Sequence, residues 1–422
     1  MTDGSDGKIV EFPLPKPEDK KTESAPGPLP AAYAPILPSI CWRSGFSEFR
    51  DAYTKTTEAC DEFLFGAFLT LAGFALGRET TIGSLKTTTN NYICYVGLSG
   101  KSRKTTVQQF IVDTAARLQL GFEHVPGIGS AEGIIDALSG TPRMLLDIAE
   151  ISMLLQKAKQ DGTKSLIPML TQLYDCPNVY RLHTRTNPVI CKTPFLSIIT
   201  ASTPAWLKES LDAADIRGGF MGRFQILVGI EKSAIPWPPP PKEHYMKCAE
   251  GVLNEAKERH KGGRKYELSE GAMEIWDTWY RENYVADAKN EILNVIAVRL
   301  HQHAIKLACV YAGLEGAETI LEEHITAACA YAEYQRKAQA FVFGDFDESK
   351  EVAWERSIFN TISRFQTRHG RPPRIHEIKS NCKHIPSVVF NRTLDAMRKS
   401  GTITYSYDGK SAFAGVSPEA PV

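Results

Sequence analysis

Hydrophobic residues gather in short runs and in longer periodic segments along this chain. Short apolar runs rich in β-branched and aromatic residues predict buried strands at 92–96, 142–147 and 195–200, and a further strand after residue 223. Between them lie segments with apolar residues at helical spacing. One of these, Asp61 to Leu76, is apolar on nearly every face, which is typical of a helix buried inside a core. This alternation of strands and helices predicts an α/β fold.

The strand at 92–96 leads into a loop and helix with the organisation of a phosphate-binding loop. Glycines let backbone N–H groups close around phosphate oxygens, and a helix N-terminus adds partial positive charge. A lysine then reaches the β- and γ-phosphates of ATP, and the hydroxyl beside it holds Mg²⁺. The candidate nucleotide-binding residues are Gly97, Ser99, Gly100, Lys104, Thr105 and Thr106, with Thr105 as a metal ligand.

The spacing of this loop departs from the usual G-x4-G-K-[ST] pattern. The interval from Gly97 to Lys104 is one residue too long, and Arg103 stands where the second glycine is expected. A rival register uses Lys101 and Ser102, although the loop after Gly97 is then too short. We favour Lys104, and both registers remain open at this point.

The apolar run from Pro142 delivers two acids at its end, Asp147 and Glu150. ATP hydrolysis needs one carboxylate in the Mg²⁺ shell and one residue to orient the attacking water. The two acids are normally adjacent, whereas here they are three apart. Either Asp147 is the metal ligand and Glu150 the base, or Glu150 alone is at the site. Acids at strand ends also serve as plain helix caps.

The segment from Val179 to Lys192 predicts a β-hairpin with a basic face. Side chains two apart in a strand share a face, and a turn follows at Asn187-Pro188. The hairpin either contacts nucleic acid in the pore of a subunit ring or is a solvated surface feature. Its candidate DNA-binding residues are Arg181, His183, Arg185 and Lys192.

Two further positions suit chemistry on a γ-phosphate. Thr200 ends a buried strand, where a polar residue can sense the γ-phosphate. Arg223 follows a glycine-rich loop, which is how an arginine finger is presented to a neighbouring subunit. Arg217 is the second choice for the finger. Arg299 is a candidate sensor from a helical lid, although a structural ion pair is the simpler interpretation.

The last part of the chain differs in charge from the rest. Residues 355–410 contain eleven Lys or Arg and four acids, which gives +7 in a chain of net charge +0. The pattern there is three helices, then two short strands around Asp408-Gly409. This order predicts a winged helix that binds DNA phosphates. The candidate contacts are Lys383, Asn391, Arg392, Arg398 and Lys399.

Length, cysteine usage and hydropathy bound the remaining choices. A chain of 422 residues allows two or three domains, and nine scattered cysteines without a C-x-x-C pair argue against a zinc module or a disulfide framework. The absence of a signal peptide and of a long uncharged apolar run predicts a cytoplasmic protein without a membrane span. The expected organisation is a disordered arm (1–40), an N-terminal helical subdomain (41–88), a P-loop ATPase core (89–236), a helical lid (237–345) and a winged helix (350–416).

Four segments together resemble an uncharacterised P-loop ATPase family of phages and mobile elements, often labelled primase-helicase-like. They are G-L-S-G-K-S-R-K-T-T, G-S-A-E-G-I-I-D-A-L, E-I-S-M-L-L and G-G-F-M-G-R-F. Their order is also similar to that in AAA+ ring helicases of superfamily 3 and the minichromosome maintenance type. The resemblance spans roughly residues 45 to 345. It implies an ATP- and Mg²⁺-dependent DNA helicase or replication initiator that binds single- and double-stranded DNA and forms a homo-oligomer, most simply a hexamer. A nucleotide-gated loader, or a defence or transposition regulator, is the alternative.

Overall fold

The computed structural model describes most of the chain, apart from the N-terminal arm and several loops. The described residues are 34–84, 86–97, 102–127, 129–160, 163–182, 188–211, 218–230, 232–283 and 291–343. In the C-terminal part they are 354, 357–359, 361–362, 365–366, 371–382, 385–399, 402–407 and 412–416. Five predicted site residues, Ser99, Gly100, His183, Arg185 and Lys383, therefore lie outside the described residues. So do the alternatives Lys101 and Arg217, and residues 1–33 of the predicted arm.

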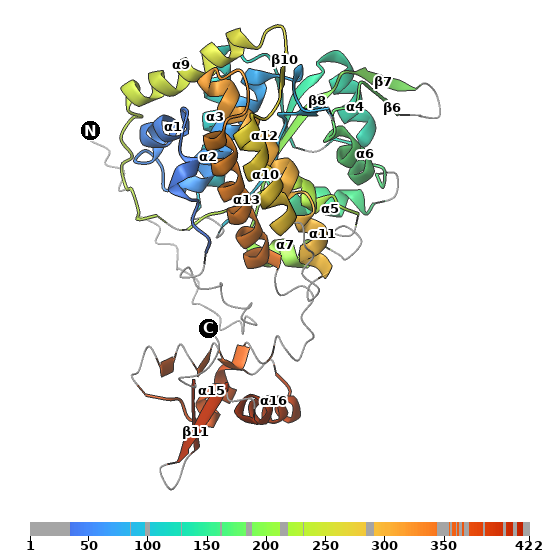
Figure 1. Ribbon diagram of the computed structural model, residues 1–422. Helices are drawn as coiled ribbons and strands as arrows, with labels where there is room; N and C mark the ends of the chain where they lie inside the picture. The colour runs from blue at the N-terminus through green and yellow to red at the C-terminus, as the bar shows by residue number, and fades with distance from the viewer. Residues whose placement is uncertain are drawn as a thin grey trace, which may run out of the picture.

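A five-stranded, all-parallel sheet forms the centre of the molecule and confirms the predicted α/β fold (Figure 1). Its strand order is β4 (Glu123–Pro126), β5 (Arg143–Ile148), β8 (Phe195–Ser202), β3 (Tyr92–Val96) and β9 (Phe224–Val228). The strand before the phosphate loop, β3, therefore lies between β8 and β9. All carboxyl ends meet at one edge of the sheet, where the loops that follow the strands come together.

Helices and short strands surround this sheet. The helices are α1 (Phe46–Tyr53), α2 (Asp61–Leu76), α3 (Lys104–Leu118), α4 (Ala131–Gly140), α5 (Ile151–Ala158), α6 (Leu166–Leu173), α7 (Pro204–Ser210), α9 (Glu243–Arg259), α10 (Glu270–Asn283), α11 (Glu291–Ala297), α12 (Leu300–Glu315) and α13 (Glu322–Phe343). A small sheet joins β1 (Thr80–Ile82), β2 (Thr87–Thr88) and β10 (Arg264–Tyr266). None of the helices in the described residues combines the length and apolar character that crossing a bilayer requires.

The structure agrees with the local sequence at one helix start and departs from it in another helix. Serine is a residue type that caps helices, which predicts a cap at Ser130, and its side chain accepts a hydrogen bond from the backbone N–H of Gly133 at the start of α4, which confirms the cap. The apolar positions from Leu293 to Gly313 predict one continuous helix, and this prediction is wrong. The segment breaks between Ala297 and Leu300 into α11 and α12, and Arg299 becomes the residue before α12.

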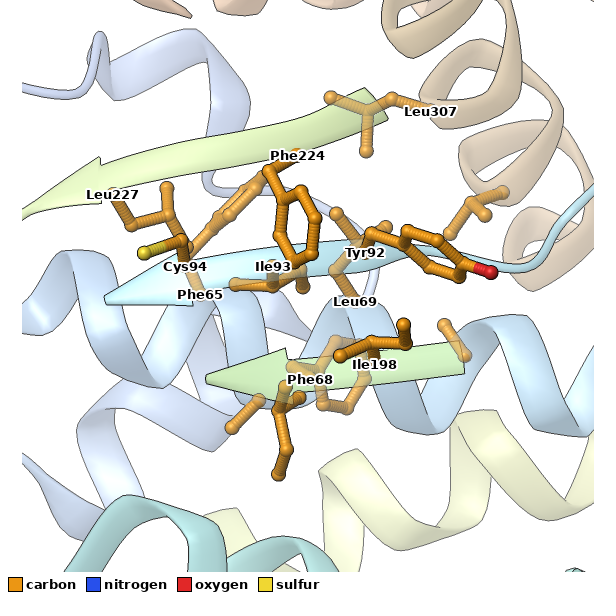
Figure 2. Packing of buried hydrophobic residues seen from close by; sticks show 14 of the residues in the cluster. Phe65, Phe68, Leu69, Tyr92, Ile93, Cys94, Ile198, Phe224, Leu227 and Leu307 are labelled. Carbon is orange, nitrogen blue, oxygen red and sulfur yellow. The ribbon is translucent and has the colours of Figure 1, made fainter. Parts of the chain in front are cut away.

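Helix α2 packs across the central strands as its composition predicts. Every residue from Phe63 to Leu76 is buried. Figure 2 shows its Phe65, Phe68 and Leu69 among side chains of β3, β8 and β9. Close approach requires glycine at two positions. A Cβ at Gly66 would lie 2.4 Å from Leu227 Cδ1, and one at Gly73 would lie 2.5 Å from the backbone oxygen of Thr89.

The core is continuous from Leu37 to Phe343. Helix α13 is joined to β9 by two hydrogen bonds from one side chain. The Gln335 side chain accepts from the backbone N–H of Ile226 at 2.7 Å and donates to the backbone carbonyl of Ile226 at 3.0 Å. The segments expected as a helical subdomain (41–88), an ATPase core (89–236) and a lid (237–345) therefore share one hydrophobic core.

The C-terminal part has a second core of its own. It contains α15 (Ile375–Asn381), α16 (Ser387–Lys399) and an antiparallel pair, β11 (Ile403–Tyr407) and β12 (Ala412–Val416), and residues 357–359 and 361–362 before them are helical. The order of helices followed by a two-stranded hairpin is the one that the sequence predicts. Phe390, Leu394 and Met397 form the buried stripe of α16, which leaves its opposite face toward solvent.

A network around Glu315 ties the N-terminal segment to α12 and α13. Arg43 donates to both carboxylate oxygens, at 2.7 and 2.9 Å, and Ser44 donates to one of them. His324 Nε2 lies 3.0 Å from Oε2, and its Nδ1 accepts from the N–H of Leu321, so Nε2 carries the proton. Burial raises the pKa of Glu315, but the bonds from His324, Arg43 and Ser44 outweigh it and lower the pKa to about 2.

This network predicts a loss of stability in acid. The pKa of Glu315 in the folded protein lies below its ordinary value of 4.5, so the stabilisation is complete above that value and is lost as pH falls toward about 2. We expect Glu315→Gln to lower the free energy of unfolding at pH 7 and to differ less from wild type at pH 3, as measured by urea denaturation. Glu255→Gln, on an exposed pair with Arg259, is the matched control. A difference that is the same at both pH values would contradict this account.

The packing of α2 gives a second prediction. Gly73→Ala places a methyl group against a backbone oxygen that has no room to move, so we expect a loss of about 1–3 kcal/mol in the free energy of unfolding. Gly251→Ala, inside α9 with nothing within 4 Å of the added Cβ, should instead stabilise by roughly 0.5–1 kcal/mol. Urea denaturation of both variants tests the pair, and equal effects would show that α2 does not pack as described.

Candidate functional site at the carboxyl edge of the sheet

Lys104 lies at the start of α3, beside the carboxyl ends of the two central strands. Its Nζ donates to the carbonyl of Gly97, after β3, and to that of Ser202, at the end of β8, both at 3.3 Å. Burial lowers the pKa of Lys104, and the neighbouring Glu150 acts in the opposite direction. The structure thus places the predicted lysine where the N-terminus of a 15-residue helix and the sheet edge meet.

Arg103 occupies the position where the predicted phosphate-loop pattern expects its second glycine. Its backbone is left-handed, with φ 46° and ψ 36°, a conformation that glycine adopts at little cost and that other residues adopt at a cost of about 1–2 kcal/mol. Its Nε donates to Glu58 Oε2 at 2.6 Å, and the other oxygen of Glu58 accepts from the N–H of Ile235. An ion pair therefore holds the backbone turn that a glycine would otherwise supply.

Glu150 follows β5 and faces Lys104. It is the residue before α5, yet its side chain makes no capping bond, and its Oε2 is buried without a hydrogen-bond partner. Burial raises the pKa of Glu150, and the nearby Lys104 lowers it. A buried carboxylate oxygen without a partner is costly, so the plain capping role considered from the sequence does not account for this side chain.

Thr200 and Ser202 supply two hydroxyls on β8, the strand whose last carbonyl accepts from Lys104. Both lie on β8, are fully buried, and have an Oγ without a hydrogen-bond partner. In the sheet register, Thr200 pairs with Cys94 on one side and Ile148 on the other, and Ser202 pairs with Val96. The following Thr203 is different, because it caps α7 by accepting from the N–H of Trp206.

Asp147 lies on the other face of the sheet. It pairs with Ile199, whereas its neighbour Ile148 pairs with Thr200, and successive side chains of a strand point to opposite faces. Its Oδ2 lies 3.1 Å from His124 Nε2. Burial raises the pKa of Asp147, and His124 lowers it. Of the two arrangements left open by the sequence, the structure favours Glu150 alone at the site.

The other predicted loop residues divide into two groups. Thr105 is exposed and Thr106 half-buried in the first turn of α3, so the Thr105 hydroxyl is open to a ligand. Gly97 is packed closely, because a Cβ there would lie 2.6 Å from Ser102 Oγ. Ser102, from the rival register, is itself buried against Gly97, which favours the Lys104 register.

Arg223 does not project from the molecule as an arginine finger would. It is 6% exposed, and its guanidinium donates to the carbonyl of Gly219 at 2.8 Å and lies 3.6 Å from Asp175. It immediately precedes β9, whose first residue, Phe224, pairs with the first residue of β3. Arg223 therefore lies at the amino edge of the sheet, at the opposite end of the strands from Lys104. Arg299 also contacts Asp175, at 4.0 Å.

The predicted nucleic-acid contacts lie on two exposed surfaces. The hairpin of β6 (Val179–Leu182) and β7 (Val189–Lys192) projects at the upper right of Figure 1. The pairs Val179–Lys192 and Arg181–Ile190 are exposed, while Cys191 on the other face packs against α4. On α16, the exposed residues include Asn391, Arg392, Arg398 and Lys399. Arg398 also lies over the ring of Tyr405, 5.3 Å from its centroid.

Ser202 is a site residue that the predicted strand, which ends at Thr200, does not include. The strand continues to Ser202, and the alternation of side chains places residues 200 and 202 on the same face. The alternation of side chains along the strand is the sequence signal that identifies Ser202, because it puts residue 202 on the same face as Thr200.

The unpaired hydroxyl of Thr200 yields a test of a functional role. Thr200→Val keeps the shape and removes a buried polar atom without a partner, so we expect the free energy of unfolding to stay unchanged or to rise by about 1–2 kcal/mol. If the site binds Mg²⁺-ATP, the same change should reduce the rise in melting temperature that the nucleotide produces. Ser197→Ala, on the same strand, removes a hydroxyl that does accept a bond, from the N–H of Asn91, and should destabilise. A strongly destabilised Thr200→Val would assign the hydroxyl a structural role instead.

No protein-family model and no curated protein sequence matches this chain. The features that point to a function are therefore structural: a lysine at a helix N-terminus, a half-buried acid with one buried, unpaired oxygen near it, and two unpaired hydroxyls on β8.

Proposed function

We propose that this chain is a nucleoside triphosphatase that couples ATP hydrolysis to DNA binding or unwinding. The observation that carries the proposal is the group formed by Lys104, Glu150, Thr200 and Ser202 at one sheet edge. Its three buried oxygens without partners suit a ligand that brings its own hydrogen-bond donors and charge, such as a hydrated phosphate.

Each residue of this group has a role that its position supports. Lys104 and the N-terminus of α3 neutralise phosphate charge. Mg²⁺, when bound, supplies further neutralisation, and the exposed Thr105 hydroxyl is suited to hold it. Glu150 accepts a proton from the attacking water, and burial, which raises its pKa, makes it a better base near neutral pH. The hydroxyls of Thr200 and Ser202 orient that water or the γ-phosphate.

The proposed DNA contacts are the exposed faces of the hairpin and of α16. In this proposal Arg181 and Lys192 on the hairpin contact a strand, and α16 acts as the recognition helix of a winged helix, with Arg398 and Lys399 on phosphates. With the resemblance to ring helicases, this favours a homo-oligomeric helicase or replication initiator. Arg223 is left out as the finger, because its charge is already directed into the protein.

A nucleotide-gated DNA-binding protein with slow turnover is the second candidate. Two features near Glu150, at Ala149 and at Asp147, favour this candidate. The residue beside Glu150 has no carboxylate, and Asp147 is engaged with His124 on the other face. A site with one acid in place of two binds nucleotide but holds the metal less firmly, so conformational gating rather than rapid hydrolysis would be its output.

Measurements of ATP turnover with and without single-stranded DNA separate these candidates. In the first, DNA stimulates hydrolysis, Lys104→Ala abolishes both nucleotide binding and turnover, and Glu150→Gln keeps binding but lowers turnover about 10²-fold or more. Asp147→Asn is the matched control and should lower turnover far less. Equal losses in Asp147→Asn and Glu150→Gln would contradict the assignment of the base.

Strand displacement on a forked duplex tests the motor itself. We expect unwinding by the wild type, its loss in the double variant Arg181→Ala, Lys192→Ala with nucleotide binding retained, and weaker duplex binding in Arg398→Ala, Lys399→Ala. Nucleotide-dependent DNA binding without unwinding or stimulated turnover would support the second candidate.

A further inference from the structure

A cavity of about 220 Å³ lies at the amino edge of the sheet, away from the site described above. It is lined by Lys86, Thr87, Thr88, Tyr174, Asp175, Gln302 and Lys306. These residues come from the small sheet, the end of α6 and the start of α12. The cavity is smaller than a drug-sized ligand pocket, which typically begins at about 300 Å³, so it suits a compact ligand.

Buried positive charge is concentrated at this cavity. Lys306 is 3% exposed, and its Nζ donates to the backbone oxygen and to Oδ1 of Asn90, both at 2.8 Å. The ammonium also lies 3.9 Å from the ring centroid of Tyr174. These partners are neutral, so they orient the charge without cancelling it.

Two arginines add to the charge behind the cavity. Arg223, 6% exposed, and Arg299 both lie near Asp175, at 3.6 and 4.0 Å, and the Arg223 guanidinium lies over Tyr174. Among the described residues that line the cavity, Asp175 is the one carboxylate, and its side chain is 55% exposed. The two lysines that line the cavity and the two arginines near Asp175 thus outnumber this one partly solvated acid.

This imbalance indicates what the cavity binds. Burying a cation without an opposite charge is costly, whereas an anion supplied from solution compensates it. The hydroxyls of Thr87 and Thr88 lie beside the cations, and groups of this kind donate to phosphate oxygens. Thr88 Oγ1 is already used toward Asn90 Oδ1 at 2.8 Å, so Thr87 is the hydroxyl better placed for a ligand.

We propose that this cavity is a second anion site, which binds the phosphate group of a small molecule between Lys86 and Lys306. It is distinct from the edge that holds Lys104, because β3 runs between them: Tyr92 at its start pairs with Phe224 beside Arg223, and Val96 at its end pairs with Ser202. Helix α12, which carries Lys306, packs against α13, and α13 is bonded to β9. A ligand there therefore contacts elements that also support the central strands.

Binding of inorganic pyrophosphate in a Lys104→Ala background tests the proposal. That variant lacks the lysine of the carboxyl-edge site, so pyrophosphate cannot bind there through Lys104. Because the variant is expected not to bind nucleotide, a neighbouring subunit also cannot supply a nucleotide phosphate to the cavity. We expect pyrophosphate to raise the melting temperature at matched ionic strength and to give a saturable isotherm in calorimetry.

Three further substitutions locate the bound anion. Lys86→Asn keeps a residue that tolerates the left-handed backbone there (φ 53°), and Lys306→Met keeps the length of the buried side chain. Each should weaken pyrophosphate binding at least tenfold. Lys247→Met, at an exposed position on α9, should leave it unchanged. If Lys306→Met does not fold, Lys86→Asn on the exposed turn decides the matter alone. No binding in the Lys104→Ala background, or binding that Lys86→Asn leaves intact, would overturn the proposal.

Discussion

The burial of β3 between β8 and β9, beneath α2, is the constraint on which the rest of the structure depends. All five residues of β3 are buried, as are all of β8 and β9. Strands this apolar satisfy their backbone groups only by pairing with one another, and they fix the positions of whatever follows them. The buried central strands therefore form a rigid support. This support fixes the positions of the polar side chains at the two edges of the sheet.

The carboxyl and amino edges of these strands differ in character. At the carboxyl edge, Lys104 and Glu150 lie close enough to influence each other's pKa, and the neighbouring strand β8 carries two unpaired hydroxyls. At the amino edge, Arg223, Arg299 and Lys306 gather around Tyr174 and a single exposed acid. The first arrangement suits chemistry on a polarised bond, because it offers both signs of charge. The second suits binding without chemistry, because it offers mainly one.

Tertiary contacts account for two departures from the predicted phosphate-loop pattern. That pattern expects a glycine where the backbone turns into α3. Here Arg103 adopts the same left-handed geometry, and Glu58, which is 45 residues away in the chain, holds it by an ion pair. Likewise, Asp147 and Glu150 do not belong to the same site. The alternation of side chains along β5 places Asp147 on the other face of the sheet, where it contacts His124. The spacing of residues in a motif reveals neither an ion pair with a distant residue nor the face of the sheet to which a side chain points.

The α/β class, the strand at 92–96, the buried character of α2 and the order of elements in the C-terminal part could be predicted from the amino-acid sequence. Each of these follows from local hydrophobic periodicity and turn chemistry, which neighbouring residues specify together. Only the tertiary structure decided that Glu150 rather than Asp147 faces Lys104, that Arg223 is directed inward, that α11 and α12 are separate, and that Lys306 lies beside a cavity with Lys86. Most of these depend on contacts between residues far apart in the chain, such as Asp175 with Arg223 and Asn90 with Lys306, and the packing of the whole core settles those contacts.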